Sequence, residues 1–276
     1  MERIKSLYSE VKSIFLTCFF EMTLQIKKFI IFSSITIVAI ILNSYLPYIL
    51  IPQLQVPNTQ VYFYQSGLNT FYLIIIFAVC FFFSGIICSE FRDKTGIIIF
   101  PKINKYKLII GKYLGNLTLV TGVICIYYLS LALIGYNFYG EPISYRLFFS
   151  FGFALLYALA LSSFITFFSS FMKSAKGTIV ITIILLLFVL NIVDALVMVI
   201  RIEFEPIFSL NYVRNIITFI LDPDFSTMDR YMEYTIGDFT IRTWLTPSIQ
   251  GAIIAFLMYM TIFFLFASLL FKRRQL

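Results

Sequence analysis

The sequence predicts an all-α membrane protein with six transmembrane helices, an amphipathic interfacial helix at its N-terminus and both termini in the cytoplasm. The first observation is composition, because 60% of the 276 residues are hydrophobic and only 13% are charged. A soluble domain has about 45–50% apolar and about 25% charged residues. The second observation is the length of the apolar stretches, and the third is the uneven distribution of lysine and arginine. We expect one membrane domain over residues 1–276.

Six apolar stretches are close to or above the roughly 20 residues that a helix needs to cross the hydrocarbon core of a bilayer. Backbone N–H and C=O groups in hydrocarbon need partners within their own segment, so we interpret these stretches as helices. The predicted spans are Phe29–Leu50, Phe71–Cys88, Leu114–Ile134, Phe148–Phe171, Ile179–Ile200 and Ser248–Phe271. The second span is the shortest, and we expect it to continue through Ser89 and Glu90.

Lysine and arginine indicate the orientation, because cytoplasmic loops carry an excess of both. With the N-terminus inside, 16 of the 21 basic residues fall on the cytoplasmic side, and the loop at residues 51–70 has none. The basic residues border the spans and form no stripe on a soluble face. The net charge of +7 therefore indicates contact with the headgroups of the lipid bilayer and argues against a nucleic-acid partner.

The chain contains no histidine. This excludes Ser-His-Asp and Cys-His nucleophilic sites, histidine-ligated haem and histidine-based zinc sites, and we expect no metal site. The four cysteines, Cys18, Cys80, Cys88 and Cys125, lie in predicted spans or on the inner side. We therefore expect no disulfide framework.

Residues 1–28 have the pattern of an amphipathic helix. Apolar side chains recur every three or four residues from Ile4 to Met22, while polar ones such as Lys5 and Lys12 occupy the other faces. A helix of this kind lies along the inner membrane surface. It is either an elbow that contacts a cytoplasmic partner or a simple interfacial anchor, and the sequence leaves both open.

The longest non-spanning segment is predicted outside the cell at residues 201–247. Its apolar stretch Pro206–Leu221 is too short to cross the membrane and suits a re-entrant or interfacial helix that ends at Asp222-Pro223. Further on, two alternating β-prone runs between Tyr234 and Ile241 flank Gly237-Asp238. This pattern predicts a tight β-hairpin.

The connector at residues 89–113 carries most of the functional information. From Ser89 to Gly115 the chain reads SEFRDKTGIIIFPKINKYKLIIGKYLG. A mixed-charge cluster from Glu90 to Lys94 precedes the apolar run Ile97–Phe100, and Pro101 ends any local helix because it lacks an N–H. An apolar run between charges at a membrane surface needs cover from a partner or from another part of the chain.

This connector resembles that of type-2 ABC transporter permeases. The matching residues are Glu90-Phe91-x-x-Lys94-Thr95-Gly96, then Pro101, then Gly111-Lys112-Tyr113-Leu114. In that family a Glu closes the second span, a Gly/Thr pair opens a short coupling helix, and a Pro and a Gly-Lys lead into the third span. Thr95-Gly96 stands here where Gly-Thr is commoner. The six spans, amphipathic N-terminal helix, large outer segment and basic tail are also similar to the family.

The resemblance implies the membrane subunit of an ATP-driven exporter in a prokaryotic cell membrane. Two permease copies, identical or different, would pair above two ABC ATPase subunits. The chain has no G-x-x-x-x-G-K-[ST] phosphate loop, so ATP and Mg²⁺ would be bound by the ATPase partner and not by this chain. The positions implied to couple to the ATPase are Glu90, Arg92, Asp93, Thr95, Gly96, Ile98, Phe100 and Pro101.

Two further groups of residues have both a structural and a functional interpretation. Gly111 and Gly115 form G-x-x-x-G beside Lys112, a spacing that favours close helix packing. Asp194 is the only acidic residue inside a predicted span, where a carboxylate is costly. It either reaches the outer interface or, with Asn191, lines a translocation path.

The alternative to a permease is a non-transporting integral membrane protein, such as an assembly or immunity factor or a membrane enzyme. The absence of histidine excludes a Ser-His intramembrane protease. No cluster of acidic residues on the predicted inner side indicates a lipid-head transferase. The sequence leaves the transported substrate open, because one fold serves many substrates.

Overall fold

The computed structural model describes residues 2–51, 55–92, 105–199, 204–236 and 239–273. The helices and strands are α1 (Glu2–Ile40), the π-helix η1 (Ile41–Tyr45), α2 (Leu46–Leu50), α3 (Gln60–Phe83), α4 (Cys88–Arg92), α6 (Lys105–Tyr139), α7 (Arg146–Phe171), α8 (Ala175–Ile184), the π-helix η2 (Leu185–Val189), α9 (Leu190–Val199), α10 (Leu210–Arg214), α11 (Ile216–Phe219), the 3₁₀ helix η3 (Pro223–Ser226), β1 (Tyr231–Ile236), β2 (Phe239–Trp244) and α12 (Ile249–Arg273).

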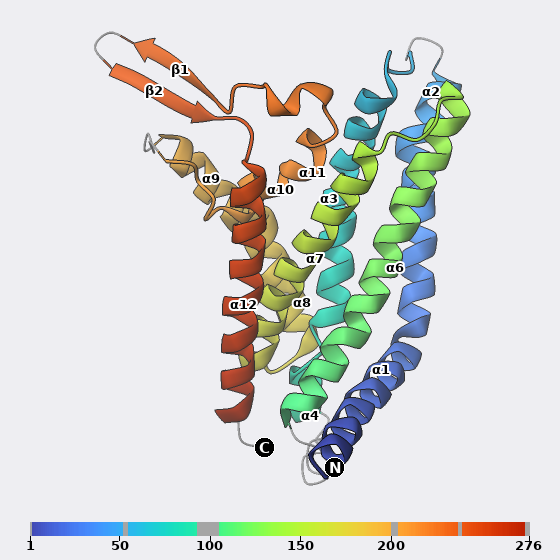
Figure 1. Ribbon diagram of the computed structural model, residues 1–276, viewed down its shortest axis with the longest axis vertical. Coiled ribbons are helices and arrows are strands. Elements are labelled where there is room, and N and C mark those ends of the chain that lie inside the picture. Colours follow the sequence, from blue (N-terminus) through green and yellow to red (C-terminus); the bar gives the residue numbers. More distant parts are fainter. Residues whose placement is uncertain (1, 52–54, 93–104, 200–203, 237–238, 274–276) are drawn as a thin grey trace.

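The prediction of a helical protein with six apolar segments is confirmed. Six helical segments of the described chain are long and apolar enough to cross a membrane, which indicates a multi-pass membrane protein. Their bounds are Val11–Leu50, Gln60–Phe91, Lys105–Tyr139, Arg146–Phe171, Ala175–Leu196 and Ile249–Arg273. The first turns of α1 and the last turns of α12 lie at the same end of the bundle (Figure 1).

The first two helical segments begin earlier in the chain than the predicted spans. One continuous helix, α1, covers both the predicted elbow at residues 1–28 and most of the first span. The second span begins at Gln60, eleven residues before the predicted Phe71. Polar residues such as Gln60, Gln65 and Asn69 interrupt the apolar run there, whereas the hydroxyl of Thr59 caps the helix by accepting a hydrogen bond from the N–H of Tyr62.

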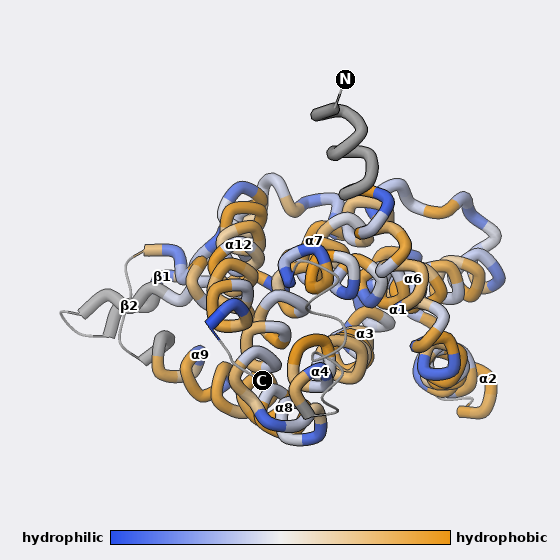
Figure 2. Tube along the Cα trace, turned by 90° about the horizontal axis from the view of Figure 1, so that it is seen from below, coloured by the Kyte–Doolittle hydropathy of each residue, from blue (hydrophilic) through white to orange (hydrophobic). Residues whose placement is uncertain are grey.

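Helix α3 is the most buried of the six and lies at the centre of the bundle. It packs against α6 and α7, while α1 packs along α6 and α12 along α7 (Figure 1). Seen from the end where α1 begins, the peripheral helices carry mainly hydrophobic residues (Figure 2). Large side chains such as Phe15, Ile192 and Leu265 are exposed on them, as expected for surfaces that face lipid.

A two-stranded hairpin stands at the opposite end from the start of α1 (Figure 1). Strands β1 and β2 pair antiparallel from Tyr231↔Trp244 to Ile236↔Phe239. This register confirms the hairpin predicted around Gly237-Asp238, although those two residues lie outside the described ranges. The predicted helix at Pro206–Leu221 is present as two short helices, α10 and α11, and η3 begins at Pro223.

Side chains from the bundle and from the segment itself hold the segment between α9 and α12 in place. The guanidinium of Arg146 donates to the carbonyls of Asp222 at 2.6 Å, Pro223 at 3.1 Å and Ile220 at 3.5 Å. At the start of α12, Ser248 donates to the carboxylate of Glu205 through its N–H at 2.6 Å and its hydroxyl at 2.8 Å. A carboxylate at a helix N-terminus is also favoured by the helix dipole.

Tyr212 joins the same segment to the approach to α12. Its hydroxyl donates to the carbonyl of Thr246 at 2.8 Å. Burial raises the pKa of Tyr212, and the nearby Glu205 raises it further. The hydroxyl therefore stays protonated and remains a donor through the physiological pH range.

Two spans contain a π-helical turn, which leaves backbone carbonyls without their usual helical partners. In the first, η1 is followed by Pro47, which lacks an N–H and would clash inside a regular helix. In the fifth, the carbonyl of Leu186 in η2 accepts a hydrogen bond from the hydroxyl of Tyr72 on α3 at 3.2 Å. A side chain from a neighbouring helix thus compensates the break, as is typical of membrane helices.

The second span is broken between α3 and α4 at residues 84–87. The hydroxyl of Ser169 on α7 accepts hydrogen bonds from the N–H groups of Ile87 and Cys88, both at 3.2 Å, and donates to the carbonyl of Ser84 at 2.8 Å. Ser169 therefore holds both sides of the break, and its bond to the N–H of Cys88 places the start of α4 against α7.

Glycines allow α1 and α6 to approach closely. A Cβ added at Gly111 would lie 2.6 Å from the Cβ of Thr17, and one at Gly115 would lie 2.7 Å from the backbone carbonyl oxygen of Cys18. Side chains do not tolerate such distances, so only glycine permits this contact. The spacing of Gly111 and Gly115 thus places two contact points, one helical turn apart, against α1.

We predict that Gly115→Ala lowers the free energy of unfolding, whereas Gly152→Ala does not. Alanine is the better helix former, and nothing lies within 4 Å of a Cβ at Gly152, so Gly152→Ala should leave the free energy of unfolding unchanged or raise it by up to about 1 kcal/mol. Gly115→Ala should lower it by about 1–3 kcal/mol, because the methyl group overpacks the contact with α1. Thermal unfolding of the purified chain in detergent compares the two, and equal melting temperatures would contradict the prediction.

Candidate functional site

Two acidic side chains and one lysine meet at the end of the bundle where α1 begins. The Nζ of Lys112 on α6 forms an ion pair with Oε1 of Glu90 on α4 and lies 3.8 Å from Oε2 of Glu21 on α1. The amides of Asn116 and Gln25 donate to Oε1 of Glu21 at 3.3 Å and 3.1 Å. We call these five residues the carboxylate–lysine cluster.

The cluster is buried, which gives its charges more weight than surface charges have. Glu21 and Glu90 are each only 5% exposed, and the side chain of Lys112 is 14% exposed. An ion pair in such a site has given up its hydration, so the loss of one partner leaves a buried charge uncompensated. The two carboxylates also share one lysine, and the amides of Gln25 and Asn116 supply the remaining donors to Glu21.

The backbone contacts described above position all three charged groups. Gly115 lets α6 approach α1 so closely that a Cβ there would lie 3.1 Å from the Cβ of Glu21. Lys112 and Asn116 are one helical turn apart on α6 and therefore share the face that meets Glu21. Glu90 is placed by α4, whose first N–H is held by Ser169. Three elements that are distant in sequence thus converge on one lysine.

The cluster contains two of the residues that the sequence singled out, Glu90 and Lys112. They stand at the two ends of the connector, Glu90 before residues 93–104 and Lys112 after them, and the ion pair joins these ends. Arg92 is the last residue of α4. The remaining positions implied to contact an ATPase lie outside the described residues, namely Asp93, Thr95, Gly96, Ile98, Phe100 and Pro101.

A second polar network links α3, the fifth span and α10. The side-chain oxygen of Asn191 accepts a hydrogen bond from the amide of Asn211 at 3.0 Å. The hydroxyl of Tyr72 lies 3.4 Å from the side-chain oxygen of Asn211, and the guanidinium of Arg214 stacks on the Tyr72 ring with 3.4 Å between Cζ and the ring centroid. The network lies where α10 reaches the bundle (Figure 1).

Asp194 is bound to the start of α10. Its Oδ1 accepts a hydrogen bond from the hydroxyl of Ser209, and that hydroxyl caps α10 by accepting from the N–H of Tyr212 at 3.2 Å. Asn191 and Asp194 are thus brought close to one short helix, Asn191 through Asn211 and Asp194 through Ser209. This contact accounts for a carboxylate in an apolar span, because Asp194 has a hydrogen-bond donor.

Sequence reasoning missed Glu21 and Arg214. Glu21 is flanked by Phe20 and Met22 in an apolar stretch, which is a signal of a buried charge. Arg214 is the only charged residue between Pro206 and Leu221. The repeat Gly111-Lys112 and Gly115-Asn116, four residues apart, also indicates a helix face with small and polar residues in register.

Comparison of the chain with known protein families and with curated proteins found no match.

We predict that Lys112→Met destabilises the fold strongly, by about 3–5 kcal/mol, because it removes the cation that pairs with the buried carboxylates of Glu90 and Glu21. The exposed Lys176 provides the control, and Lys176→Met should stay within about 0.5 kcal/mol of the natural chain. The triple variant Glu21→Gln/Glu90→Gln/Lys112→Met carries no charge in the cluster and should regain most of the loss. Unfolding in detergent measures all three, and a Lys112→Met chain as stable as Lys176→Met would contradict the prediction.

Proposed function

We propose that this chain is the permease subunit of an ATP-driven type-2 ABC exporter, with its connector coupled to a separate ATPase. The observation that carries the proposal is the ion pair between Glu90 and Lys112, which joins the two ends of the connector and binds them to Glu21 of α1. The resemblance of the connector to those of type-2 permeases, six apolar helices and the absence of a phosphate loop from the chain support it.

The carboxylate–lysine cluster suits a coupling role for a mechanical reason. A force on the connector acts on α4 and on the start of α6, and the cluster transmits it to α1 through Glu21. Ser169 passes the same displacement to α7 through the break after α3. Because cores are densely packed, the contacting helices move as a unit and not as independent elements. A coupling device needs this property to switch a permease between two arrangements.

The proposal assigns different tasks to different chains. ATP and Mg²⁺ would be bound by two ATPase subunits, and a second permease copy would complete the translocation path. The connector, with Ile98 and Phe100, would dock on the ATPase. Peripheral helices with exposed apolar side chains, such as α12, offer surfaces for lipid and for a second copy. We place the chain in a prokaryotic cell membrane with both termini in the cytoplasm.

We expect the chain, purified from its native host in mild detergent, to bring with it a soluble ATPase that carries a G-x-x-x-x-G-K-[ST] motif. Ile98→Asp/Phe100→Asp should reduce the bound ATPase and its ATP turnover by about tenfold or more, because a charge in the docking surface is costly to bury. Met228→Asp, an apolar-to-acidic change at an exposed residue near the hairpin, is the matched control and should bind the ATPase normally.

The same experiment distinguishes the non-transporting alternative. Purification of an intact chain without any such ATPase would contradict the proposal and favour an assembly or immunity factor. Equal ATPase recovery with the connector variant and with Met228→Asp would show that the connector is not the docking surface. Mass spectrometry of the purified complex identifies the partner, and gel filtration shows that each variant is folded.

A further inference from the structure

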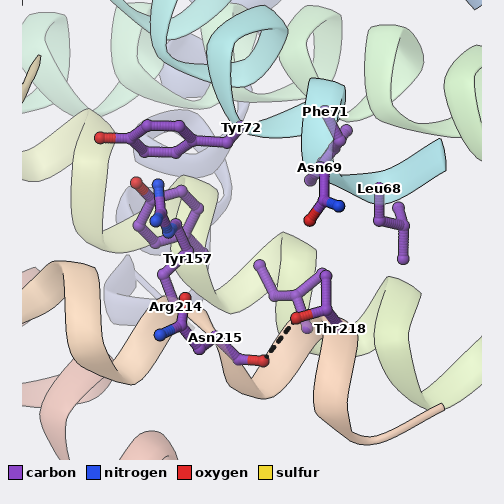
Figure 3. Close-up of a pocket in the computed structure, with 9 residues that line it drawn as sticks. Leu68, Asn69, Phe71, Tyr72, Tyr157, Arg214, Asn215 and Thr218 are labelled. Atoms are coloured by element: carbon purple, nitrogen blue, oxygen red, sulfur yellow. Dashed lines mark hydrogen bonds between the residues drawn. The ribbon is translucent and has the colours of Figure 1, made fainter. Parts of the chain in front are cut away.

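A small cavity of about 90 Å³ lies between α3, α7 and the short helices α10 and α11 (Figure 3). Its lining is mostly polar or aromatic, and none of the described residues that form it is acidic. The lining residues are Leu68, Asn69, Phe71, Tyr72, Tyr157, Arg214, Asn215, Ile217 and Thr218. Arg214 is therefore the one charged residue in the described lining of this cavity, which lies in the half of the bundle that carries the hairpin.

Arg214 contributes hydrogen-bond donors that the described part of the chain does not use. Its guanidinium stacks on the face of Tyr72, a contact that stabilises the charge. The N–H donors point outward from the edge of the guanidinium. Its Nη1 is buried and has no hydrogen-bond partner among the described residues.

Tyr157 supplies a second unused donor to the same cavity. The residue is only 1% exposed, and its hydroxyl is buried without a hydrogen-bond partner among the described residues. Figure 3 shows the Tyr157 hydroxyl on the same side of the cavity as the Arg214 guanidinium. Buried polar groups are nearly always hydrogen-bonded, so two orphaned donors that line one cavity point to a ligand that accepts from both.

We propose that this cavity binds an oxyanion, the carboxylate or phosphate group of a small solute or of a lipid headgroup. Such a group is acceptor-only and negatively charged, so it satisfies both donors and compensates the guanidinium, whose planar fork matches carboxylate and phosphate oxygens. In the same measure of volume, about 10–15 Å³ holds one water molecule, so the cavity has room for a group of a few heavy atoms. The exposed Asn69 marks the side from which the ligand enters.

The hydroxyl of Tyr72 is not part of this binding set. It donates to the carbonyl of Leu186 and lies beside Asn211, so its proton is not available to a ligand. The ligand is thus hydrogen-bonded by Arg214 of α10 and by Tyr157 of α7. The proposal goes beyond the coupling function and needs neither ATP nor an ATPase.

The test measures thermal unfolding of the purified full-length chain in two arms. In neutral detergent, sodium phosphate or sodium acetate is titrated against sodium chloride at equal ionic strength. In nanodiscs, digalactosyldiacylglycerol alone, which contains no phosphate, is compared with the same lipid plus phosphatidylglycerol. We expect a saturable rise in melting temperature above the chloride baseline, because a ligand that binds only the folded chain stabilises it. A rise in the detergent arm identifies a solute anion, and one confined to the nanodisc arm identifies a lipid phosphate.

Two conservative variants remove one recognition element each. Tyr157→Phe keeps the ring but loses the hydroxyl. Arg214→Lys keeps the positive charge but loses the planar guanidinium with its paired N–H donors. Each should weaken the apparent affinity on the order of tenfold, as expected for the loss of a hydrogen bond to a charged group. The exposed Arg230 lies in the same segment, and Arg230→Gln is the matched control that should respond as the natural chain does.

The proposal is overturned if phosphate, acetate and phosphatidylglycerol all fail to raise the melting temperature above their references. It is equally overturned if Tyr157→Phe and Arg214→Lys, shown to be folded by gel filtration, respond as the natural chain does. A loss of response in Arg230→Gln as large as that in Arg214→Lys would attribute the effect to overall charge and would also overturn it.

Discussion

The ammonium group of Lys112, buried between two carboxylates, is the interaction on which the geometry of this end of the bundle depends. Glu90 and Glu21 lie almost seventy residues apart in the sequence, and both are buried carboxylates whose charge this lysine compensates. The contact also requires Gly115, since any side chain there would push α1 away from α6. The pairing of Glu21 with Lys112 therefore depends on the close backbone approach, because Glu21 reaches the lysine only while α1 and α6 are in contact.

A second constraint explains where the remaining polar side chains lie. Membrane helices cannot leave backbone groups unpaired in hydrocarbon, and this chain breaks its helices at several points. Ser169 satisfies the break after α3, and Tyr72 satisfies the π-helical turn of the fifth span. In both cases the partner comes from another helix, so each break is stable only in the assembled bundle. The breaks consequently fix the helices relative to one another.

The sequence predicted the features that depend on local composition and left out those that depend on tertiary contact. Apolar runs were sufficient to identify all six helical segments, and Gly237-Asp238 between β-prone runs was sufficient for the hairpin. The early start of α3 was missed because Gln60 and Asn69 interrupt its apolar run, whereas burial against neighbouring helices stabilises it. Glu21 was missed for a related reason, since nothing local shows that it meets Lys112. The role of residues 93–104 in coupling stays a prediction.

Arg146 and Arg214 both contribute to the segment between α9 and α12, but they differ in how they use their hydrogen-bond donors. The difference separates an arginine that holds the fold together from one that is available to a ligand. Arg146 donates three hydrogen bonds, to the carbonyls of Ile220, Asp222 and Pro223, and thereby holds the chain after α11. Arg214 lies on the same segment, but it stacks on Tyr72 and leaves Nη1 unpaired among the described residues. Because Arg146 already secures the segment, anchoring does not account for a buried guanidinium with unused donors. A ligand that binds reversibly does account for the unpaired Nη1, since an N–H group that binds and releases a ligand cannot be permanently hydrogen-bonded to the chain.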